Sequence, residues 1–214
     1  MKLNIIITST RPNRVSPCIG KWFYEVARQN NNGLQVVLTD LADVNLPLLD
    51  EPYHPSKHQY LHEHTKIWSN IIETSDAFVF ILPEYNSCAP PSFVNAIDYL
   101  YNEWNFKPVG FVGYGAINGG RHSVDNAKNL MEAVMALPVE QSVIIEHAVD
   151  QMSDDKFIAK DTQISAAKRM IESIAVVASE LREMRTPGNI EAVKKVSWNK
   201  FSPWHADILS QAGQ

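Results

Sequence analysis

The 214-residue chain is 45% hydrophobic and 20% charged, which is typical of a folded globular protein and excludes a chain that is disordered throughout. Its formal net charge of −5 argues against a nucleic-acid or anionic-membrane surface, and no apolar run reaches the roughly 18 residues of a membrane span. The start lacks a signal-peptide pattern, and the two cysteines, Cys18 and Cys88, form neither a disulfide framework nor a CxxC pair, so we expect a cytoplasmic protein.

Short apolar, β-branched runs alternate with longer helical patterns along the chain. We expect strands at residues 3–8, 34–39, 77–82, 109–114 and 143–146. Most are apolar at both odd and even positions, as strands covered on both faces should be. Apolar residues at three- and four-residue spacing predict helices at residues 16–29, 57–73, 91–103, 124–135 and 162–184. Five strands interleaved with five helices predict an α/β flavodoxin-like domain, a parallel sheet of order 2-1-3-4-5 with helices on both faces.

Two segments exceed this minimum. Residues 41–56 form a long polar, proline-containing connection, which is either functional or an elaborated loop. We expect the domain to end at residue 186 and a C-terminal extension to occupy residues 187–214. The extension carries Trp198, Phe201 and Trp204, which either bind a partner or pin the segment to the domain or to a second subunit.

The loop after the first strand combines four hydroxyl side chains with two arginines and then enters a helix. Its residues are Thr8, Ser9, Thr10, Arg11, Pro12, Asn13, Arg14, Val15 and Ser16. Backbone N–H groups at a helix N-terminus bind anions, and hydroxyls and guanidinium groups add charge-assisted hydrogen bonds. The loop therefore predicts a phosphate site; the alternative is a solvated loop in which Ser16 caps the helix. It lacks the GxxxxGK and GxGxxG patterns, which argues against a nucleoside triphosphate and against Rossmann-bound NAD.

Two further loops follow the third and fourth strands, at the same edge of the predicted sheet. In the first, Pro83, Tyr85 and Asn86 offer a flat apolar surface with exposed backbone amides, although a plain proline-rich turn has the same composition. In the second, residues 113–121 hold four glycines, which let backbone approach a planar ligand closely. A flexible connection is the alternative interpretation of the second loop.

These loops resemble the NADPH-dependent FMN reductase family over about residues 3–150. The family pattern reads roughly GS-x-R, then PEYN-x-S-x-P-x-x-x-K-N-A-x-D, then KP, YG and GG. The matching residues are Ser9-Thr10-Arg11, Pro83-Glu84-Tyr85-Asn86, Pro90, Asn95-Ala96-Ile97-Asp98, Glu103-Trp104, Lys107-Pro108, Tyr114-Gly115 and Gly119-Gly120. The ordered spacing from PEYN to NAID is the specific part of the match.

The resemblance implies a noncovalent flavin mononucleotide (FMN) site made from all three loops. Its residues are Ser9, Thr10, Arg11, Arg14, Val15, Ser16, Pro83, Glu84, Tyr85, Asn86, Tyr114, Gly115 and Gly119. Ser9, Arg11, Arg14 and Ser16 would hold the phosphate. The PEYN segment would hold the flavin edge, and the third loop would flank the ring. Thr8 in place of Gly, Ser87-Cys88 in place of Gly-Ser or His-Ser, and Val94 in place of Lys depart from the family without removing a phosphate ligand.

The resemblance also implies an activity: hydride passes from NADPH or NADH to bound FMN, and electrons pass on to a small acceptor such as free flavin or a quinone. The flavin supplies this chemistry, so we expect no catalytic side chain. A flavodoxin-like electron carrier and a non-catalytic FMN-binding module are the alternatives, although carriers are usually more acidic than this chain. Cys88 has no histidine near it in sequence and is interpreted as a packing residue.

Two further expectations concern metals and assembly. His58 and His62 lie four apart on an expected helix, a metal-ligand spacing, but no cysteine is near, so we expect no metal. The helix expected at 91–103 carries more apolar surface than one buried face absorbs, in Phe93, Tyr99, Leu100, Tyr101 and Trp104. Since the family commonly pairs subunits through the helices after strands three and four, we expect a homodimer or homotetramer.

Overall fold

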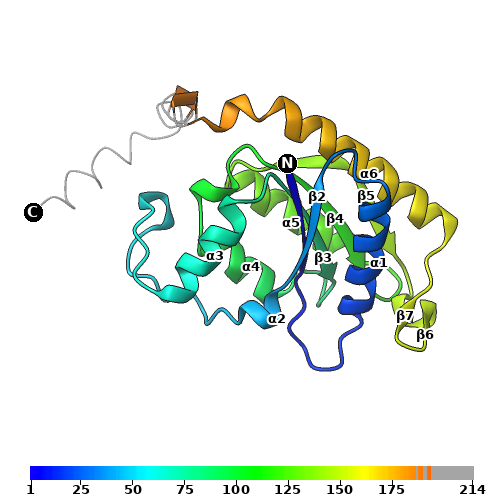
Figure 1. The fold of residues 1–214 in the computed structure, drawn as a ribbon. Helices are drawn as coiled ribbons and strands as arrows, with labels where there is room; N and C mark the ends of the chain where they lie inside the picture. Colours follow the sequence, from blue (N-terminus) through cyan, green and yellow to red (C-terminus); the bar gives the residue numbers. More distant parts are fainter. Residues whose placement is uncertain (187, 190–191, 194–214) are drawn as a thin grey trace, which may run out of the picture. The chain divides into compact units, whose positions relative to one another are not determined.

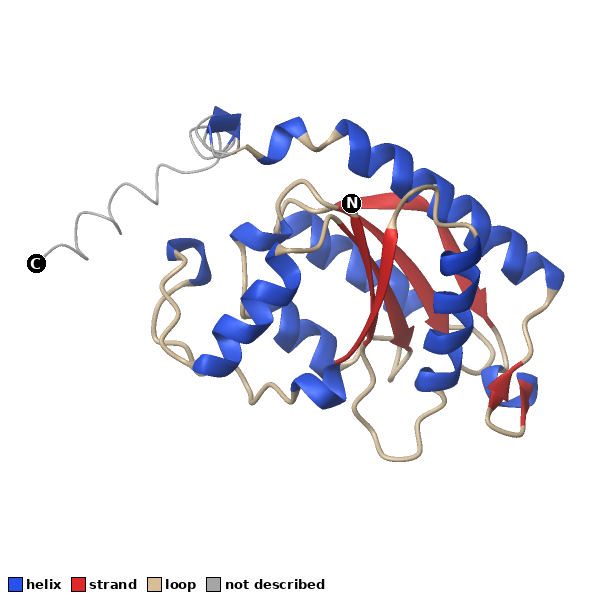
Figure 2. Cartoon of the chain, in the orientation of Figure 1, coloured by secondary structure: helices blue, strands red, loops and turns tan. Residues whose placement is uncertain are grey.

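The computed structural model describes residues 1–186, 188–189 and 192–193, of which Met1–Glu180 form one compact unit. Five strands build its sheet: β1 (Lys2–Ile7), β2 (Gln35–Asp40), β3 (Ala77–Pro83), β4 (Pro108–Tyr114) and β5 (Leu137–Ile145). They pair in parallel in the order β2-β1-β3-β4-β5 (Figures 1 and 2). The predicted flavodoxin-like fold is confirmed.

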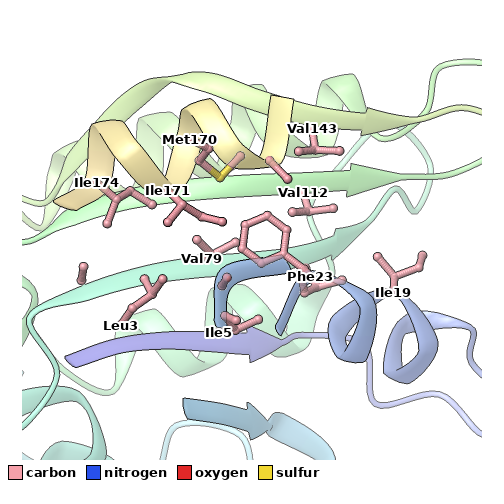
Figure 3. Close-up of a cluster of buried hydrophobic side chains, with 14 of the residues drawn as sticks. Leu3, Ile5, Ile19, Phe23, Val79, Val112, Val143, Met170, Ile171 and Ile174 are labelled. Carbon is pink, nitrogen blue, oxygen red and sulfur yellow. The ribbon is translucent and has the colours of Figure 1, made fainter. Parts of the chain in front are cut away.

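Helices cover both faces of the sheet because successive strand residues point to opposite sides. On one face, Leu3 and Ile5 of β1 belong to the core cluster that α1 (Ser16–Gln29) and α6 (Asp161–Glu180) close. Figure 3 shows Phe23 of α1 and Met170 of α6 in this cluster. On the other face, Ile6 packs in a second cluster with α3 (Glu63–Glu73), α4 (Pro91–Asp98) and α5 (Arg121–Ala133). Each fully buried Leu, Ile or Phe contributes roughly 1.5–3 kcal/mol.

Several predicted bounds differ from the structure. Helix α1 has the predicted bounds, and α5 begins three residues earlier than expected. The strand expected at 143–146 is the end of a nine-residue edge strand whose polar centre, Glu140-Gln141-Ser142, hides its apolar pattern. The helix expected at 91–103 ends at Asp98, and a separate 3₁₀ turn follows at Asn102–Trp104.

The helix expected at 57–73 begins only at Glu63. A 3₁₀ turn occupies Pro55–Lys57, and His58 ends it in a left-handed conformation with φ of 51°. His62 precedes α3 in an extended conformation, so His58 and His62 do not share a helix face as the sequence suggested. The prediction that His58 and His62 lie on one helix was therefore wrong.

The long connection after β2 is ordered and tied to α4. It begins with the short helix α2 (Leu41–Val44). Asn95 of α4 then accepts a hydrogen bond from the Leu49 N–H at 2.9 Å and donates one to the Pro47 carbonyl at 2.7 Å. This segment is thus an elaborated loop that covers part of the α4 surface.

After β5 the chain adds a 3₁₀ turn (Ala148–Gln151) and a small hairpin of β6 (Met152–Ser153) and β7 (Lys156–Phe157), none of which the sequence predicted. Helix α6 follows but ends at Glu180 rather than at residue 184. Beyond it, a 3₁₀ turn spans Glu183–Arg185.

The predicted boundary at residue 186 stays a prediction. Trp198, Phe201 and Trp204 lie outside the described residues. Within the part of the chain that the structure describes, no helix is both long and apolar enough to cross a membrane.

Candidate active site at the carboxyl edge of the sheet

The loops after β1, β3 and β4 meet at one edge because their strands are parallel neighbours. The register pairs Ile7 with Ile81, and Pro83 with Tyr114, so the three strands end side by side. The loop between β1 and α1 extends beyond the strand ends at the lower edge of Figure 1. A pocket of about 190 Å³ opens there, lined by Ser9, Arg11, Pro12, Asn13, Arg14, Val15, Pro83, Tyr85 and Tyr114.

The N-terminus of α1 carries polar atoms with no partner. Ser16 is fully buried, and within the described residues its Oγ makes no hydrogen bond of adequate geometry, although the Tyr114 hydroxyl lies close enough to interact with it. Nε of Arg14 is also buried and has no hydrogen-bond partner among the described residues. Val15 is the N-cap residue and no described side chain caps the helix, so the interpretation of Ser16 as the cap was wrong. Unpartnered donors at an uncapped helix N-terminus suit an anion.

The two arginines of the loop differ in their surroundings. Arg14 is mostly buried, and its Nη2 pairs with the Asp40 carboxylate at the end of β2 at 2.5 Å. Arg11 is exposed, and its guanidinium carbon lies 5.6 Å from the centre of the Tyr85 ring, within cation–π range. Arg14 is therefore held in place, whereas Arg11 stands at the rim of the pocket. Thr10 is exposed and does not line the pocket.

Tyr85 reaches from the loop after β3 to the loop after β1. Its hydroxyl lies 2.8 Å from Ser9 Oγ. Its backbone exchanges hydrogen bonds with Cys88 at 3.1 and 3.0 Å, while Asn86 and Ser87 adopt positive φ values of 52° and 61°. This is the geometry of a two-residue type I′ turn, which fixes the Tyr85 backbone. Sequence reasoning placed Tyr85 along the ring edge and missed this contact with the first loop.

Three other residues of the loop after β3 are absent from the pocket lining. Asn86 and Cys88 are exposed, so the interpretation of Cys88 as a packing residue was wrong. Glu84 turns its carboxylate to α5, where it accepts hydrogen bonds from the backbone N–H of His122 at 3.1 Å and lies 3.1 Å from His122 Nδ1. Burial alone would raise the pKa of Glu84, but the hydrogen bonds and charge of His122 outweigh it, so this pKa is lowered. The sequence analysis did not single out His122.

The glycines of the third loop serve close backbone contact. Gly119 and Gly120 have φ values of 61° and 87°, in the left-handed region. A Cβ on Gly120 would lie 2.4 Å from the Tyr114 backbone nitrogen. Gly115, which directly follows the pocket residue Tyr114, is half-buried, whereas Gly119 is buried and a Cβ on it would lie 2.6 Å from the Ile144 side chain of β5. Burial raises the pKa of Tyr114 well above its ordinary value, against the opposing effect of Ser16, so its hydroxyl stays protonated as a donor.

The histidine cluster offers no metal geometry. Among the described residues, no group of three or more His, Cys, Asp or Glu side chains is placed to hold a metal ion. His62 and His64 stack with their ring centres 5.2 Å apart, and His64 Nε2 lies 3.0 Å from Asp50. These contacts tie the loop after β2 to the start of α3.

A sequence model of the NADPH-dependent FMN reductase family matches residues 1–150. The chain belongs to this family. It is 35% identical over 149 residues to an NAD(P)H-dependent FMN reductase of Nectria sp, covering 67% of this chain and 74% of that protein. An NAD(P)H-dependent FMN reductase of Schizosaccharomyces pombe is also 35% identical, over 158 residues, covering 70% and 78% of the two chains.

Solved structures share the fold of this FMN reductase family member. FerB, a flavoenzyme NAD(P)H:(acceptor) oxidoreductase from Paracoccus denitrificans, superposes with a TM-score of 0.61 at 22% identity, covering 85% of this chain and 97% of FerB. RosB, solved with a bound riboflavin phosphate derivative, superposes with a TM-score of 0.67 at 14% identity, covering 95% and 88%. At these identities the likeness concerns the fold.

Proposed function

We propose that each chain binds one FMN noncovalently at this pocket, with its phosphate at the N-terminus of α1, and passes reducing equivalents from NADPH or NADH to a small acceptor. The observation that carries the proposal is a pair of buried atoms, Ser16 Oγ and Arg14 Nε, that make no hydrogen bond of adequate geometry with any described residue and lie beside a helix N-terminus that no described side chain caps. A phosphate would accept from both and gain from the helix dipole.

The residues present fit FMN. Ser9, Ser16, Arg11 and Arg14 supply hydroxyl and guanidinium donors, which bind phosphate oxygens by charge-assisted hydrogen bonds. The pocket continues to Pro83 and Tyr114, the last residues of β3 and β4, where the family pattern predicts the ring site. Thr10, Val15, Glu84, Asn86, Gly115 and Gly119 complete the proposed site, mostly through backbone.

The bound flavin would supply the redox chemistry, accepting hydride from the nicotinamide and giving electrons to the acceptor. The chain's task is then to position and shield. Tyr85 has its backbone fixed by the turn to Cys88 and its hydroxyl held by Ser9, so it can form a rigid wall of the pocket. We propose free flavins and quinones as acceptors, since a planar ring exposed at the rim favours planar partners.

The proposed flavin content and turnover can be tested on the purified protein. Its absorption spectrum is recorded first, and NADPH is then added under anaerobic conditions. We expect flavin bands near one FMN per chain that bleach on addition, followed by steady NADPH oxidation once a quinone is supplied. A protein without flavin affinity would contradict the proposal. Bound FMN that NADPH does not reduce would favour a carrier or a non-catalytic module.

We also propose that the protein is a cytoplasmic homodimer or homotetramer. The sequence suggested an oligomer because the segment 91–103 carries many apolar residues. That argument does not hold, because four of them are buried in the chain's own core: Phe93, Tyr99, Leu100 and Trp104. Several exposed apolar side chains lie instead on α3, α4 and the loop after β2, among them Leu48, Leu61, Ile67 and Val94. Light scattering is expected to give twice or four times the chain mass. A mass of one chain at every protein concentration would contradict this.

A further inference from the structure

Glu84 and His122 connect two elements that border the proposed ring site. Glu84 is the first residue after β3, and His122 is the second residue of α5. One carboxylate oxygen accepts the His122 backbone N–H at 3.1 Å, and the other lies 3.1 Å from its Nδ1. The Glu84 side chain is mostly buried, at 12% exposed, whereas that of His122 is 50% exposed.

The same two residues fix the loop between β4 and α5. The Glu84 backbone N–H donates to the Tyr114 carbonyl at 3.1 Å, and its Cβ lies 3.6 Å from the position of a Cβ on Gly115. Asn118 Nδ2 lies 3.4 Å from His122 Nδ1. One carboxylate thus spans the loop after β3, the backbone of the loop after β4 and the N-terminus of α5. Neither Glu84 nor His122 lines the pocket, so their effect on a ligand would act through these loops.

We propose that Glu84 and His122 form a clasp that positions both ring-binding loops and makes the affinity for the flavin ring depend on pH. This inference rests on the proposed function, because it assigns the loops to the ring. The side chains of Glu84 and His122 are positioning groups and not ligands of the flavin; any contact of Glu84 with the flavin is through its backbone. With His122 charged, an ion pair reinforces the hydrogen bonds of the clasp; with His122 neutral, only the hydrogen bonds remain.

Of the charged groups near His122, Glu84 is the one that contacts its imidazole directly. Arg121 on the same helix is exposed and pairs with Glu146 beyond β5 at 3.4 Å. Asp125 lies one helical turn along α5 and is exposed. A charged imidazole holds the Glu84 carboxylate more firmly than a neutral one, so we expect ring affinity to be higher on the acidic side of the measured pH range than on the alkaline side.

The test measures riboflavin binding to flavin-free protein by fluorescence quenching from pH 5.5 to 8.5. Riboflavin is the probe because it has the ring but lacks the FMN phosphate, whose own titration near pH 6 would obscure the profile. His122→Ala is expected to weaken binding about fivefold at pH 6 and to flatten the profile. Glu84→Ala, which also removes the contact to the helix backbone, is expected to weaken riboflavin binding about tenfold.

Glu84→Gln is the conservative variant, since its amide can accept from the His122 N–H and donate to a neutral imidazole. It is expected to bind within about twofold of wild type at pH 8 and to show no pH dependence. His54→Ala is the matched control, because His54 is exposed and bonds Ser56 rather than either ring loop. Its profile is expected to match wild type.

The outcomes separate the clasp from the proposed function. Wild type that binds riboflavin and FMN, with a His122→Ala profile unchanged, overturns the clasp alone. A loss in His122→Ala that is equal at every pH overturns the pH dependence and leaves a purely structural contact. Wild type that binds neither flavin overturns the proposed function and the clasp together.

Discussion

Helices α1 and α5 lie on opposite faces of the same sheet and begin at the same edge of it, yet the polar groups at their N-termini are arranged in opposite ways. At α1 no described side chain caps the helix, and Ser16 Oγ and Arg14 Nε are buried and make no hydrogen bond of adequate geometry within the described part of the chain. At α5 the carboxylate of Glu84 accepts the His122 backbone N–H. One helix end is left open and the other is closed by the chain itself.

The difference shows how the protein separates two tasks. A helix N-terminus carries partial positive charge, which an anionic ligand or an anionic side chain can neutralise. Because Glu84 already neutralises the start of α5, an anion gains less there. The start of α1 has no acidic residue in its first turn and keeps its field for a ligand. The loop that leads into α1 accordingly supplies six of the nine residues that line the pocket, and α5 supplies none.

The largest expected effect concerns the phosphate itself. If the open end of α1 binds it, two charge-assisted hydrogen bonds make FMN bind at least about 100-fold more tightly than riboflavin. Fluorescence titration of flavin-free protein with both ligands measures the ratio. Inorganic phosphate serves as the control and is expected to compete with FMN but not with riboflavin. Equal affinities for the two flavins would place the anion site elsewhere.

Arg11 supplies the next test. Arg11→Ala is expected to weaken FMN binding by about 10- to 150-fold, because one charge-assisted hydrogen bond is lost. Its thermal unfolding should not change, since the side chain is exposed. Arg121→Ala, at the closed helix end, is the matched control and should leave FMN affinity within about twofold. If the control loses as much as Arg11→Ala, the two helix ends are not distinct.

The sequence predicts most of the fold but not the contacts that distinguish the two helix N-termini. The bounds of α1 and the sheet order were predictable because central strands are apolar at both parities and α1 has a regular apolar face. The length of β5 was not predictable, because β5 is an edge strand and an edge strand tolerates polar residues that hide its pattern. The contacts between Ser9 and Tyr85 and between Glu84 and His122 join residues 76 and 38 positions apart. No local pattern encodes such pairs; the fold creates them.

Ser16 tests whether function opposes stability at the open end. A buried hydroxyl without a partner costs free energy, so Ser16→Ala should leave flavin-free protein at least as stable as wild type. The same change removes a phosphate donor and is expected to weaken FMN binding about tenfold. Thermal unfolding without flavin and FMN titration give the two values.

Ser123 in the first turn of α5 is the matched control for Ser16. Its Oγ is also buried and unpartnered among the described residues, but Ser123 lies on α5, away from the loop between β1 and α1 that supplies most of the pocket lining. Ser123→Ala should therefore preserve FMN affinity. Destabilised Ser16→Ala protein with normal FMN affinity would show that the hydroxyl serves the fold and not the ligand.

The smallest expected effect is the acid sensitivity of the closed end. The pKa of Glu84 is lowered in the folded protein, where hydrogen bonds and charge from His122 outweigh the opposing effect of burial. A carboxylate with a lowered folded pKa stabilises the protein above its unfolded pKa of about 4.3, and this contribution is lost as pH falls through the folded value. Glu84→Gln should therefore lower the free energy of unfolding by up to about 1 kcal/mol at pH 7, and by progressively less below about pH 4.3. Urea unfolding of flavin-free wild type and Glu84→Gln, at pH 7 and again below about pH 4.3, measures the difference in their free energies of unfolding. His122→Ala removes part of the interaction and should show an intermediate dependence, whereas a wild-type advantage that grows on acidification would reverse the sign and refute a charged Glu84 at the start of α5.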